Sequence, residues 1–293
     1  MADLEGNIDA DQFATSQPQE TPGFHVKGAG QLDFGIRHRL ARIFREDGRT
    51  VMLAFDHGYF QGPTSGLERV DLNIVPLAPH ADALMATRGI IRSVIPAGCD
   101  NALVLRASGG PSILKELSDE RVAMEMRDAA RIDAAAVAVQ VFIGGEHETQ
   151  SIKNLNEMID AGLDYGIPVL GVTAVGRDLV RDARYLGLAT RIIAEFGAQM
   201  VKTYYCDDFE KVTAACPVPI IMAGGKKLPI GDALTMARRA IDAGAAGVDM
   251  GRNIFQRTRP EAMIQAVNAV VHDGLQPGEA EEMYRDLSDG ADD

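Results

Sequence analysis

Residues 198–225, AQMVKTYYCDDFEKVTAACPVPIIMAGG, contain two short β-forming runs with a helical segment between them. The runs are QMVKTYY at 199–205 and VPIIMAGG at 218–225, and both are rich in apolar, β-branched or aromatic residues. Their starting points are about 20 residues apart, which is the length of one strand and one helix together. A connection of this length joins parallel strands, so the stretch predicts one unit of a parallel α/β fold.

Six more runs of the same kind occur along the chain. They lie at 50–57, 81–88, 102–108, 135–144, 168–175 and 247–253. With the two runs above they make strand-helix units that fill about 220 residues, the size of a (β/α)8 barrel. A helix predicted at 260–274 completes the last unit. We therefore predict an α/β fold with a single (β/α)8 TIM barrel, and an open, doubly wound parallel sheet is the alternative.

The barrel is predicted to occupy residues 46–275, with an extra segment at each end. Residues 1–45 are predicted to form an N-terminal arm and a short amphipathic helix, GIRHRLARIF at 35–44, and residues 276–293 an acidic C-terminal tail. Because the barrel is complete without the arm and the helix, we expect both to lie outside the barrel wall. There they are predicted to help bury a subunit interface.

The 293 residues carry a formal net charge of −13, which excludes some classes of partner. Such an acidic surface repels nucleic acid and anionic membrane, so neither is predicted as a partner. No apolar run approaches the roughly 18 residues of a membrane span, and the acidic N-terminus is unlike a signal peptide. The cysteines, Cys99, Cys206 and Cys216, are spaced like neither a disulfide framework nor a metal pair, and Cys206 is interpreted as an inert thiol. We expect a cytoplasmic protein.

In a (β/α)8 barrel, the active site lies at the carboxyl ends of the strands. Polar side chains near the predicted ends are Asp56, His57, Arg106, Gln140, Lys202, Tyr204, Lys226, Lys227, Arg252 and Asn253. Side chains two residues apart share one face of a strand. If Val201 faces the helices, then Lys202 and Tyr204 face the barrel interior. The same rule places Asp56 inside, so a lysine and an aspartate are expected to meet near the barrel mouth.

Lys202 lies inside an apolar β run, where a buried ammonium is costly unless it is paired or neutralised. One interpretation is a structural ion pair with Asp56 or Asp249. The other is a lysine whose pKa is lowered by burial and by nearby cations such as Lys226 or Arg252. Its neutral amine would then attack a substrate carbonyl and form a Schiff base. The residues alone leave both interpretations open.

Two glycine-containing turns follow consecutive predicted strands, AGGKK at 223–227 and GRN at 251–253. Each places a backbone N–H group beside a cation, which is the arrangement of a phosphate site at this end of a barrel. The predicted phosphate-binding residues are Gly224, Gly225, Lys226, Gly251 and Arg252. The six histidines include no pair with zinc-ligand spacing, so no metal site is predicted, and His57 is either catalytic or structural.

Four motifs resemble those of the archaeal-type class I aldolase family, whose members form a lysine Schiff base on a (β/α)8 barrel. They are LAFDHGYFQGP at 53–63, VKTYY at 201–205, AGGKKLP at 223–229 and GVDMGRNIFQ at 247–256. The likeness extends over nearly the whole chain, including KGAGQLDFGIRHRLARIF at 27–44. It implies that Lys202 is the Schiff-base lysine, that Asp56 is an acid/base partner, and that the glycine turns bind phosphate.

The resemblance also implies an acyltransferase chemistry. The members it resembles transfer an acetyl group to coenzyme A from a phosphorylated dione, formed in degradation of the quorum-sensing signal autoinducer-2, and release dihydroxyacetone phosphate. Coenzyme A would be a co-substrate, no cofactor would be bound permanently, and the enzyme would be a homodecamer. One departure is Phe142, where the aldolases of the family have a tyrosine. Proton transfer is therefore left to Asp56, His57 or Tyr204.

Two other functions remain as alternatives at this stage. A class I sugar-phosphate aldolase of the fructose-bisphosphate type would use the same lysine, and Phe142 is the feature against it. A catalytically silent regulator that binds a phosphosugar would need no nucleophilic lysine. Fold and lysine alone do not separate these functions.

Overall fold

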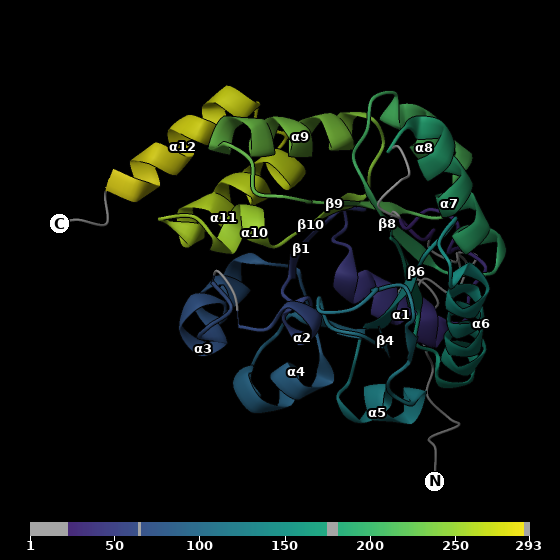
Figure 1. Ribbon diagram of the computed structural model, residues 1–293. Coiled ribbons are helices and arrows are strands. Elements are labelled where there is room, and N and C mark those ends of the chain that lie inside the picture. Colours follow the sequence, from purple (N-terminus) through teal and green to yellow (C-terminus); the bar gives the residue numbers. More distant parts are fainter. Residues whose placement is uncertain (1–22, 64–65, 175–180, 290–293) are drawn as a thin grey trace, which may run out of the picture.

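The computed structural model describes residues 23–63, 66–174 and 181–289 of the chain. Eight parallel strands close into a barrel, in which each strand pairs with the barrel strands before and after it and β10 pairs with β1 (Figure 1). The strands are β1 (Thr50–Ala54), β2 (Ala83–Ala86), β3 (Ala102–Arg106), β6 (Ala136–Val141), β7 (Val169–Thr173), β8 (Met200–Tyr204), β9 (Ile220–Ala223) and β10 (Gly247–Met250). All of them fall within the predicted runs, so the barrel is confirmed and the open sheet is excluded.

Helices surround the barrel in Figure 1. The outer layer consists of α4 (Arg88–Val94), α5 (Met126–Arg131), α6 (Glu148–Tyr165), α7 (Ala183–Glu195), α8 (Phe209–Ala215), α9 (Ile230–Asp242), α11 (Pro260–Asn268) and the π-helical turn η2 (Ala269–Asp273). Shorter elements follow β1 and β10, namely α2 (Gly58–Gln61), α3 (Val70–Asn73), the 3-10 helix η1 (Val75–His80) and α10 (Arg252–Phe255). Of these, α2 and α10 lie at the carboxyl end of the barrel, where they border the site described below.

Buried apolar side chains form two clusters, one between the strands and the helices and one inside the barrel. On β1, Val51 belongs to the outer cluster and Met52 to the inner one. On β8, Met200 belongs to the inner cluster and Val201 to the outer one. Because side chains alternate along a strand, Lys202 faces the barrel interior, as predicted.

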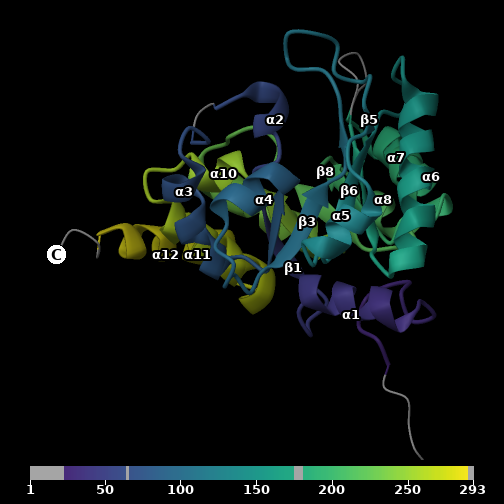
Figure 2. The same ribbon diagram turned by 90° about the horizontal axis from the view of Figure 1, so that it is seen from below.

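Helix α1 (Phe34–Ile43) closes the amino-terminal end of the barrel (Figure 2). Its side chains Leu40 and Ile43 are fully buried and share the inner cluster with Ala83 and Ala102, which stand at the starts of β2 and β3. These small side chains leave room for the helix. This apolar face is buried within its own chain, and Phe34 at the start of the helix is exposed. Most of the predicted N-terminal arm lies outside the described residues, and the part of the arm and helix in a subunit interface stays a prediction.

Helix α12 (Pro277–Asp289) occupies most of the segment predicted as an acidic tail. It packs against α9 and α11, with Ala280 and Tyr284 buried in the contact. Acidic residues such as Glu282 and Asp286 lie on its exposed side. This segment is therefore part of the helical layer, because an amphipathic stripe is hidden among its acidic residues.

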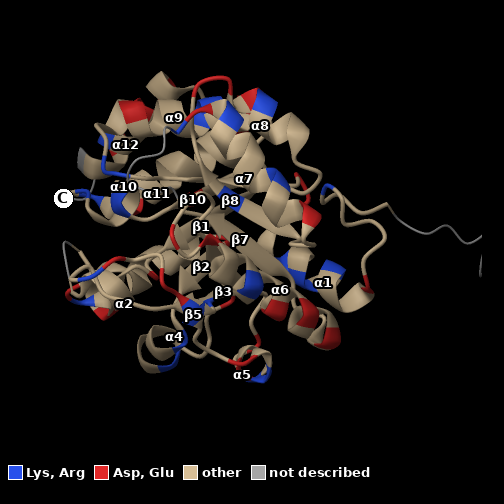
Figure 3. Ribbon diagram, turned by 45° about the vertical axis from the view of Figure 1, so that its right-hand side comes forward, with Lys and Arg blue, Asp and Glu red and all other residues tan. Residues whose placement is uncertain are grey.

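A short antiparallel hairpin, β4 (Ser108–Gly109) and β5 (Arg121–Val122), lies between β3 and α5. In Figure 2 it is at the end of the barrel opposite α1. Figure 3 shows charged residues of both signs spread over the outer helices. Within the described residues, no helix has both the length and the apolar character that crossing a bilayer requires.

Candidate active site

A cavity of about 210 Å³ lies at the carboxyl ends of the barrel strands. Its lining comes from all barrel strands and is formed by Ala54, Asp56, His57, Phe60, Gln61, Met85, Arg106, Gln140, Val172, Thr173, Lys202, Tyr204, Ala223, Gly224, Gly225, Asp249 and Arg252. The cavity therefore brings together every residue predicted to be catalytic. Of the predicted phosphate-binding residues, Lys226 and Gly251 are not in its lining.

Lys202 reaches this cavity from β8 and forms an ion pair with Asp249 of β10. Its Nζ lies 2.7 Å from Oδ2 of Asp249, and the two side chains are 11% and 0% exposed. The described residues offer the Asp249 carboxylate no hydrogen-bond donor besides this ammonium. The predicted ion pair therefore exists, and Asp249 rather than Asp56 is the direct partner.

The ion pair shifts the pKa of both groups. Burial by itself lowers the pKa of Lys202, but the negative charges of Asp249 and Asp56 outweigh burial and raise it above its usual value. Burial raises the pKa of Asp249 to about 6, although the ammonium opposes this shift. The expectation of a lowered lysine pKa is wrong, because carboxylates are the charges nearest to the amine and the cations Lys226 and Arg252 are not.

Asp56, just after β1, is held by Arg106 of β3. Nη1 of Arg106 lies 2.9 Å from Oδ2 of Asp56, and its Nη2 lies 2.6 Å from Oε1 of Glu120. Burial raises the pKa of Asp56, but Arg106 and Lys202 outweigh burial, and the pKa is lowered. Asp56 is thus a carboxylate at neutral pH, so it can accept a proton but has none to donate.

Glu120 enters this network from the hairpin and was not found by sequence reasoning. It also accepts hydrogen bonds from the hydroxyl of Tyr59 at 2.7 Å and from that of Ser108 at 2.6 Å. Arg106 donates a further hydrogen bond to the side chain of Gln140. In the sequence, Arg106 is the residue that indicates a further acidic partner. A buried guanidinium has several N–H donors, and these need more acceptors than one aspartate provides.

His57 is half-buried beside Phe255, with ring centroids 5.9 Å apart and ring planes at 17°. Burial lowers the pKa of His57, and the Asp56 carboxylate opposes this effect. The positive charges of Arg252 and Lys202 lower it further. The net shift is downward, so the imidazole is neutral at pH 7 and can act as a base.

The glycine turns after β9 and β10 lie against each other at one side of the cavity. Gly225 has a φ of 66°, a conformation that glycine adopts without strain. A β-carbon at Gly251 would lie 2.2 Å from the carbonyl oxygen of Ala54, so position 251 tolerates no side chain. Nη2 of Arg252 donates to the carbonyl oxygen of Gly225 at 2.9 Å and ties the two turns together.

Asn253 fixes the turn after β9 and was assigned no role from the sequence. Its Nδ2 donates to the carbonyl oxygens of Gly224 and Lys226 at 2.7 and 2.9 Å. Its Oδ1 accepts from the backbone N–H of Leu228 at 2.8 Å. The Lys226 side chain is exposed and does not line the cavity, so its role in phosphate binding stays a prediction.

Tyr204 and Phe142, both considered in the sequence analysis, differ in their relation to the cavity. Tyr204 lines it, and the guanidinium of Arg181 lies 3.8 Å from the centre of its ring. Phe142 is buried outside it, and its backbone N–H donates to Oγ of Ser151 at 3.0 Å.

Burial and neighbouring acidic groups raise the pKa of Cys206 to about 11, so this thiol is unreactive at neutral pH. In the described part of the chain, no three His, Cys, Asp or Glu side chains are grouped to hold a metal ion.

The fold and the cavity with its interior lysine are those of an aldolase-type enzyme. The chain belongs to the DeoC/LacD aldolase family, whose family model matches residues 50–257. This range runs from β1 to just beyond α10, so it includes every residue that lines the cavity.

Two relatives and one solved structure illustrate the likeness. The 3-hydroxy-5-phosphonooxypentane-2,4-dione thiolase of Yersinia pseudotuberculosis serotype O:1b (strain IP 31758) is 61% identical over 274 residues, which cover 93% of this chain and 94% of the relative. The protein of the same name from Yersinia pestis (strain Pestoides F) has the same identity and coverage. An archaeal fructose 1,6-bisphosphate aldolase superposes with a TM-score of 0.74 at 25% identity and covers 82% of this chain and 100% of its own.

Proposed function

We propose that this chain is an acyltransferase, a thiolase that acts on 3-hydroxy-5-phosphonooxypentane-2,4-dione. It transfers the acetyl group of this phosphorylated dione to coenzyme A and releases dihydroxyacetone phosphate, through a Schiff base on Lys202. The observation that carries the proposal is the position of Lys202, inside a cavity beside Asp249 and the glycine turns, in a chain 61% identical to proteins of that name.

Lys202 has to lose a proton before its amine attacks the C4 carbonyl of the substrate. Asp249 is the proposed acceptor, because it lies 2.7 Å away and has a pKa of about 6. Substrate entering the cavity displaces water, and the loss of solvation favours the neutral amine and carboxylic acid over the charged pair. The proton on Asp249 is then available to the carbinolamine oxygen, which leaves as water when the imine forms.

The phosphate of the substrate is proposed to bind at the turns after β9 and β10. Arg252 uses one guanidinium N–H for the carbonyl of Gly225 and has further N–H groups for a phosphate oxygen. In the substrate, C5 carries the phosphate and C4 forms the imine, so the phosphate site has to be next to the lysine. Lys202, Gly225 and Arg252 line the same small cavity, which supports this arrangement.

With C4 held as an iminium, the thiolate of coenzyme A adds to the C2 carbonyl, and the C2–C3 bond then breaks. The electron pair of that bond moves into a C3–C4 double bond, and the C4–N π pair moves onto the nitrogen. Acetyl-coenzyme A leaves, and an enamine remains on Lys202. A proton added at C3 and water added at C4 release dihydroxyacetone phosphate and restore the amine. The atoms and electrons balance without an oxidant or a reductant.

His57 is the proposed base that takes the proton of the coenzyme A thiol, because its lowered pKa keeps it neutral at pH 7. The carboxylate of Asp56 next to it would stabilise the imidazolium that results. Tyr204 lines the same cavity and is the proposed proton donor to C3; the proton that His57 took from the thiol then restores the hydroxyl of Tyr204. Phe142 offers no acid group, which sets this chain apart from the aldolases that it resembles.

A sugar-phosphate aldolase is the second candidate, favoured by the likeness to the archaeal fructose 1,6-bisphosphate aldolase. It would form the same enamine with a different electrophile. Phe142, buried outside the cavity, argues against it.

A coupled assay separates these functions. We expect acetyl-coenzyme A from the phosphorylated dione, together with a borohydride-trapped adduct of dihydroxyacetone phosphate on Lys202. Faster cleavage of fructose 1,6-bisphosphate would favour the aldolase, and neither turnover nor adduct would favour a regulator that only binds.

The enzyme is proposed to work in the cytoplasm, where coenzyme A is available, and to assemble as a homodecamer. Large apolar side chains exposed at one end of the barrel support an assembly, among them Phe34 and Tyr165 at 74% and 46% exposure. The two are near each other, because a β-carbon on Gly35 would lie 3.5 Å from the α-carbon of Gly166. Aromatic surface of this kind commonly marks a contact between proteins.

A further inference from the structure

A second cavity, of about 400 Å³, lies next to the catalytic cavity. Asp56 lines both cavities. Along helix α2, Phe60 and Gln61 line the catalytic cavity, whereas Gly58 and Tyr59 line the second one. A single turn of helix therefore separates the two spaces.

We propose that the second cavity binds the pantetheine arm of coenzyme A and delivers its thiol to the substrate past Asp56. This inference rests on the proposed thiolase function. The turns proposed for the phosphate follow β9 and β10, and the lysine belongs to β8. The second cavity instead lies at the ends of β1 and β2, so a reactant held there does not compete with the phosphate or with the imine.

The lining of the second cavity suits a chain that is mostly apolar but carries amide groups. Phe55, Leu67 and Ile90 contribute apolar surface. Thr87 also lines it, and its side chain makes no capping hydrogen bond to α4, which leaves the hydroxyl for an amide. The volume falls in the range of about 300 to 1,000 Å³ that is usual for small-molecule sites.

Two glycines, Gly62 and Gly89, belong to the wall of this cavity. Neither Gly62 nor Gly89 has an atom within 4 Å of the place where a β-carbon would lie. Gly62 has a φ of 82°, so a side chain there would strain the backbone. Gly89 lies in the first turn of α4, where helical dihedral angles accept an L side chain without strain. A side chain introduced at Gly89 therefore changes the wall of the cavity without distorting the chain.

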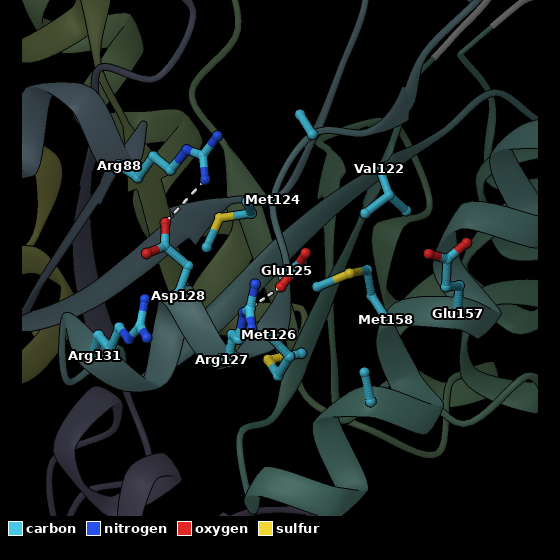
Figure 4. A pocket seen from close by; sticks show the side chains of 12 residues that line it. Arg88, Val122, Met124, Glu125, Met126, Arg127, Asp128, Arg131, Glu157 and Met158 are labelled. Atoms are coloured by element: carbon cyan, nitrogen blue, oxygen red, sulfur yellow. Dashed lines mark hydrogen bonds and ion pairs between the residues drawn. The ribbon is translucent and has the colours of Figure 1, made fainter.

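A larger cavity, of about 650 Å³, lies outside the barrel between α5 and α6 (Figure 4). It has no lining residue in common with the catalytic cavity. Four of its charged side chains form ion pairs with each other, Arg88 with Asp128 at 2.9 Å and Arg127 with Glu125. A thiol held there would be separated from the substrate, so the smaller cavity beside α2 is the better site for the reactive end of coenzyme A.

Substitutions at Gly89, in the wall of the second cavity, test the proposal. Gly89→Ala and Gly89→Leu introduce side chains of increasing size there. The matched control is Gly98→Leu, because Gly98 also has open space around its β-position but lines a different cavity. We expect the KM for coenzyme A to rise about tenfold or more in Gly89→Leu and less in Gly89→Ala. The KM for the dione and the borohydride-trapped fraction with dihydroxyacetone phosphate should stay as in the wild type, and Gly98→Leu should match the wild type throughout.

The outcomes separate this inference from the function on which it rests. An unchanged KM for coenzyme A in Gly89→Leu overturns the cavity assignment while wild-type turnover still supports the thiolase. A wild-type enzyme that forms no acetyl-coenzyme A overturns both. If Gly89→Leu also loses the borohydride-trapped adduct, the variant Thr87→Val tests the site instead, because it only replaces a hydroxyl group with a methyl group. A raised KM for coenzyme A in that variant supports the site, and an unchanged one overturns it.

Discussion

Replacing Lys202 with methionine is expected to change how folding stability depends on pH, as well as to abolish turnover. Methionine is of similar length and can keep the apolar contacts of the stem, but it carries no charge. Asp249 then loses the ammonium that lies 2.7 Å away, the one donor that the described residues provide for it. A carboxylate left in this position is buried without a counter-charge, which is strongly unfavourable.

The size of the effect follows from the pKa of Asp249. In the wild type this pKa is about 6, against an ordinary value of 3.8. The difference, 6 − 3.8 = 2.2 units, corresponds to about 3 kcal/mol at 1.36 kcal/mol per unit. Because the folded pKa is the higher one, this stability is fully present below pH 3.8 and is lost as the pH rises through about 6. Without Lys202 the pKa rises further, and the additional loss near pH 8 is at most about 3 kcal/mol, because a carboxyl group with a pKa above 8 stays protonated there and the wild-type value is about 6.

Urea unfolding at about pH 5 and about pH 8 measures this difference. Near pH 5 the carboxyl group is protonated in both proteins, so the two stabilities should approach each other. The control is the double variant Lys202→Met with Asp249→Asn, whose neutral amide should recover most of the loss near pH 8. Equal destabilisation of the single variant at both pH values would refute the reasoning, because the carboxylate would then not be its cause.

Three further outcomes are expected. Arg252→Ala should raise the KM for the dione about ten- to a hundredfold with kcat largely kept, because a charge-assisted phosphate contact is worth about 1.5 to 3 kcal/mol. An unchanged KM would contradict the assignment of Arg252 to the phosphate site. Burial lowers the pKa of His272, but hydrogen bonds to Asp82 and Asp47 at 2.9 and 2.7 Å outweigh it and raise the pKa. Its stabilising contribution is therefore full below the ordinary value of 6.5 and lost as the pH rises through the raised pKa, so His272→Gln should lower the melting temperature more at acidic than at alkaline pH. Tyr165→Asp should reduce the mass of the assembly in light scattering, and an unchanged mass would exclude this surface from the interface.

The barrel and the inward direction of Lys202 were predictable because both depend on local patterns. Strand alternation has a period of two residues, so a few outward apolar side chains fix the direction of their neighbours. The same rule correctly placed Asp56 on the cavity. The rule did not identify the ion-pair partner of Lys202. Strand alternation shows which side chains face the interior but not how far apart they are, and Asp249 lies closer to the amine than Asp56 does.

The rest of the site depends on residues whose roles come only from tertiary contacts. Glu120 lies in a hairpin loop without hydrophobic periodicity, and nothing local indicates that it meets Arg106. Asn253 acts through carbonyl groups of another turn, which no side-chain pattern reveals. For Lys226 the sequence gives the residue type but not the exposure of its side chain, which depends on how the turn folds.

Helix α1 has a consequence for how the chain folds during synthesis. Its buried face shares one cluster with residues of strands from β1 to β9, including Ala102 and Ile221. The ribosome releases the helix long before these strands exist, and the ring closes only when β10 pairs with β1. Until then Leu40 and Ile43 have nothing to cover them. A nascent or truncated chain therefore presents an apolar helix to its surroundings, which makes it a substrate for chaperones and a starting point for aggregation.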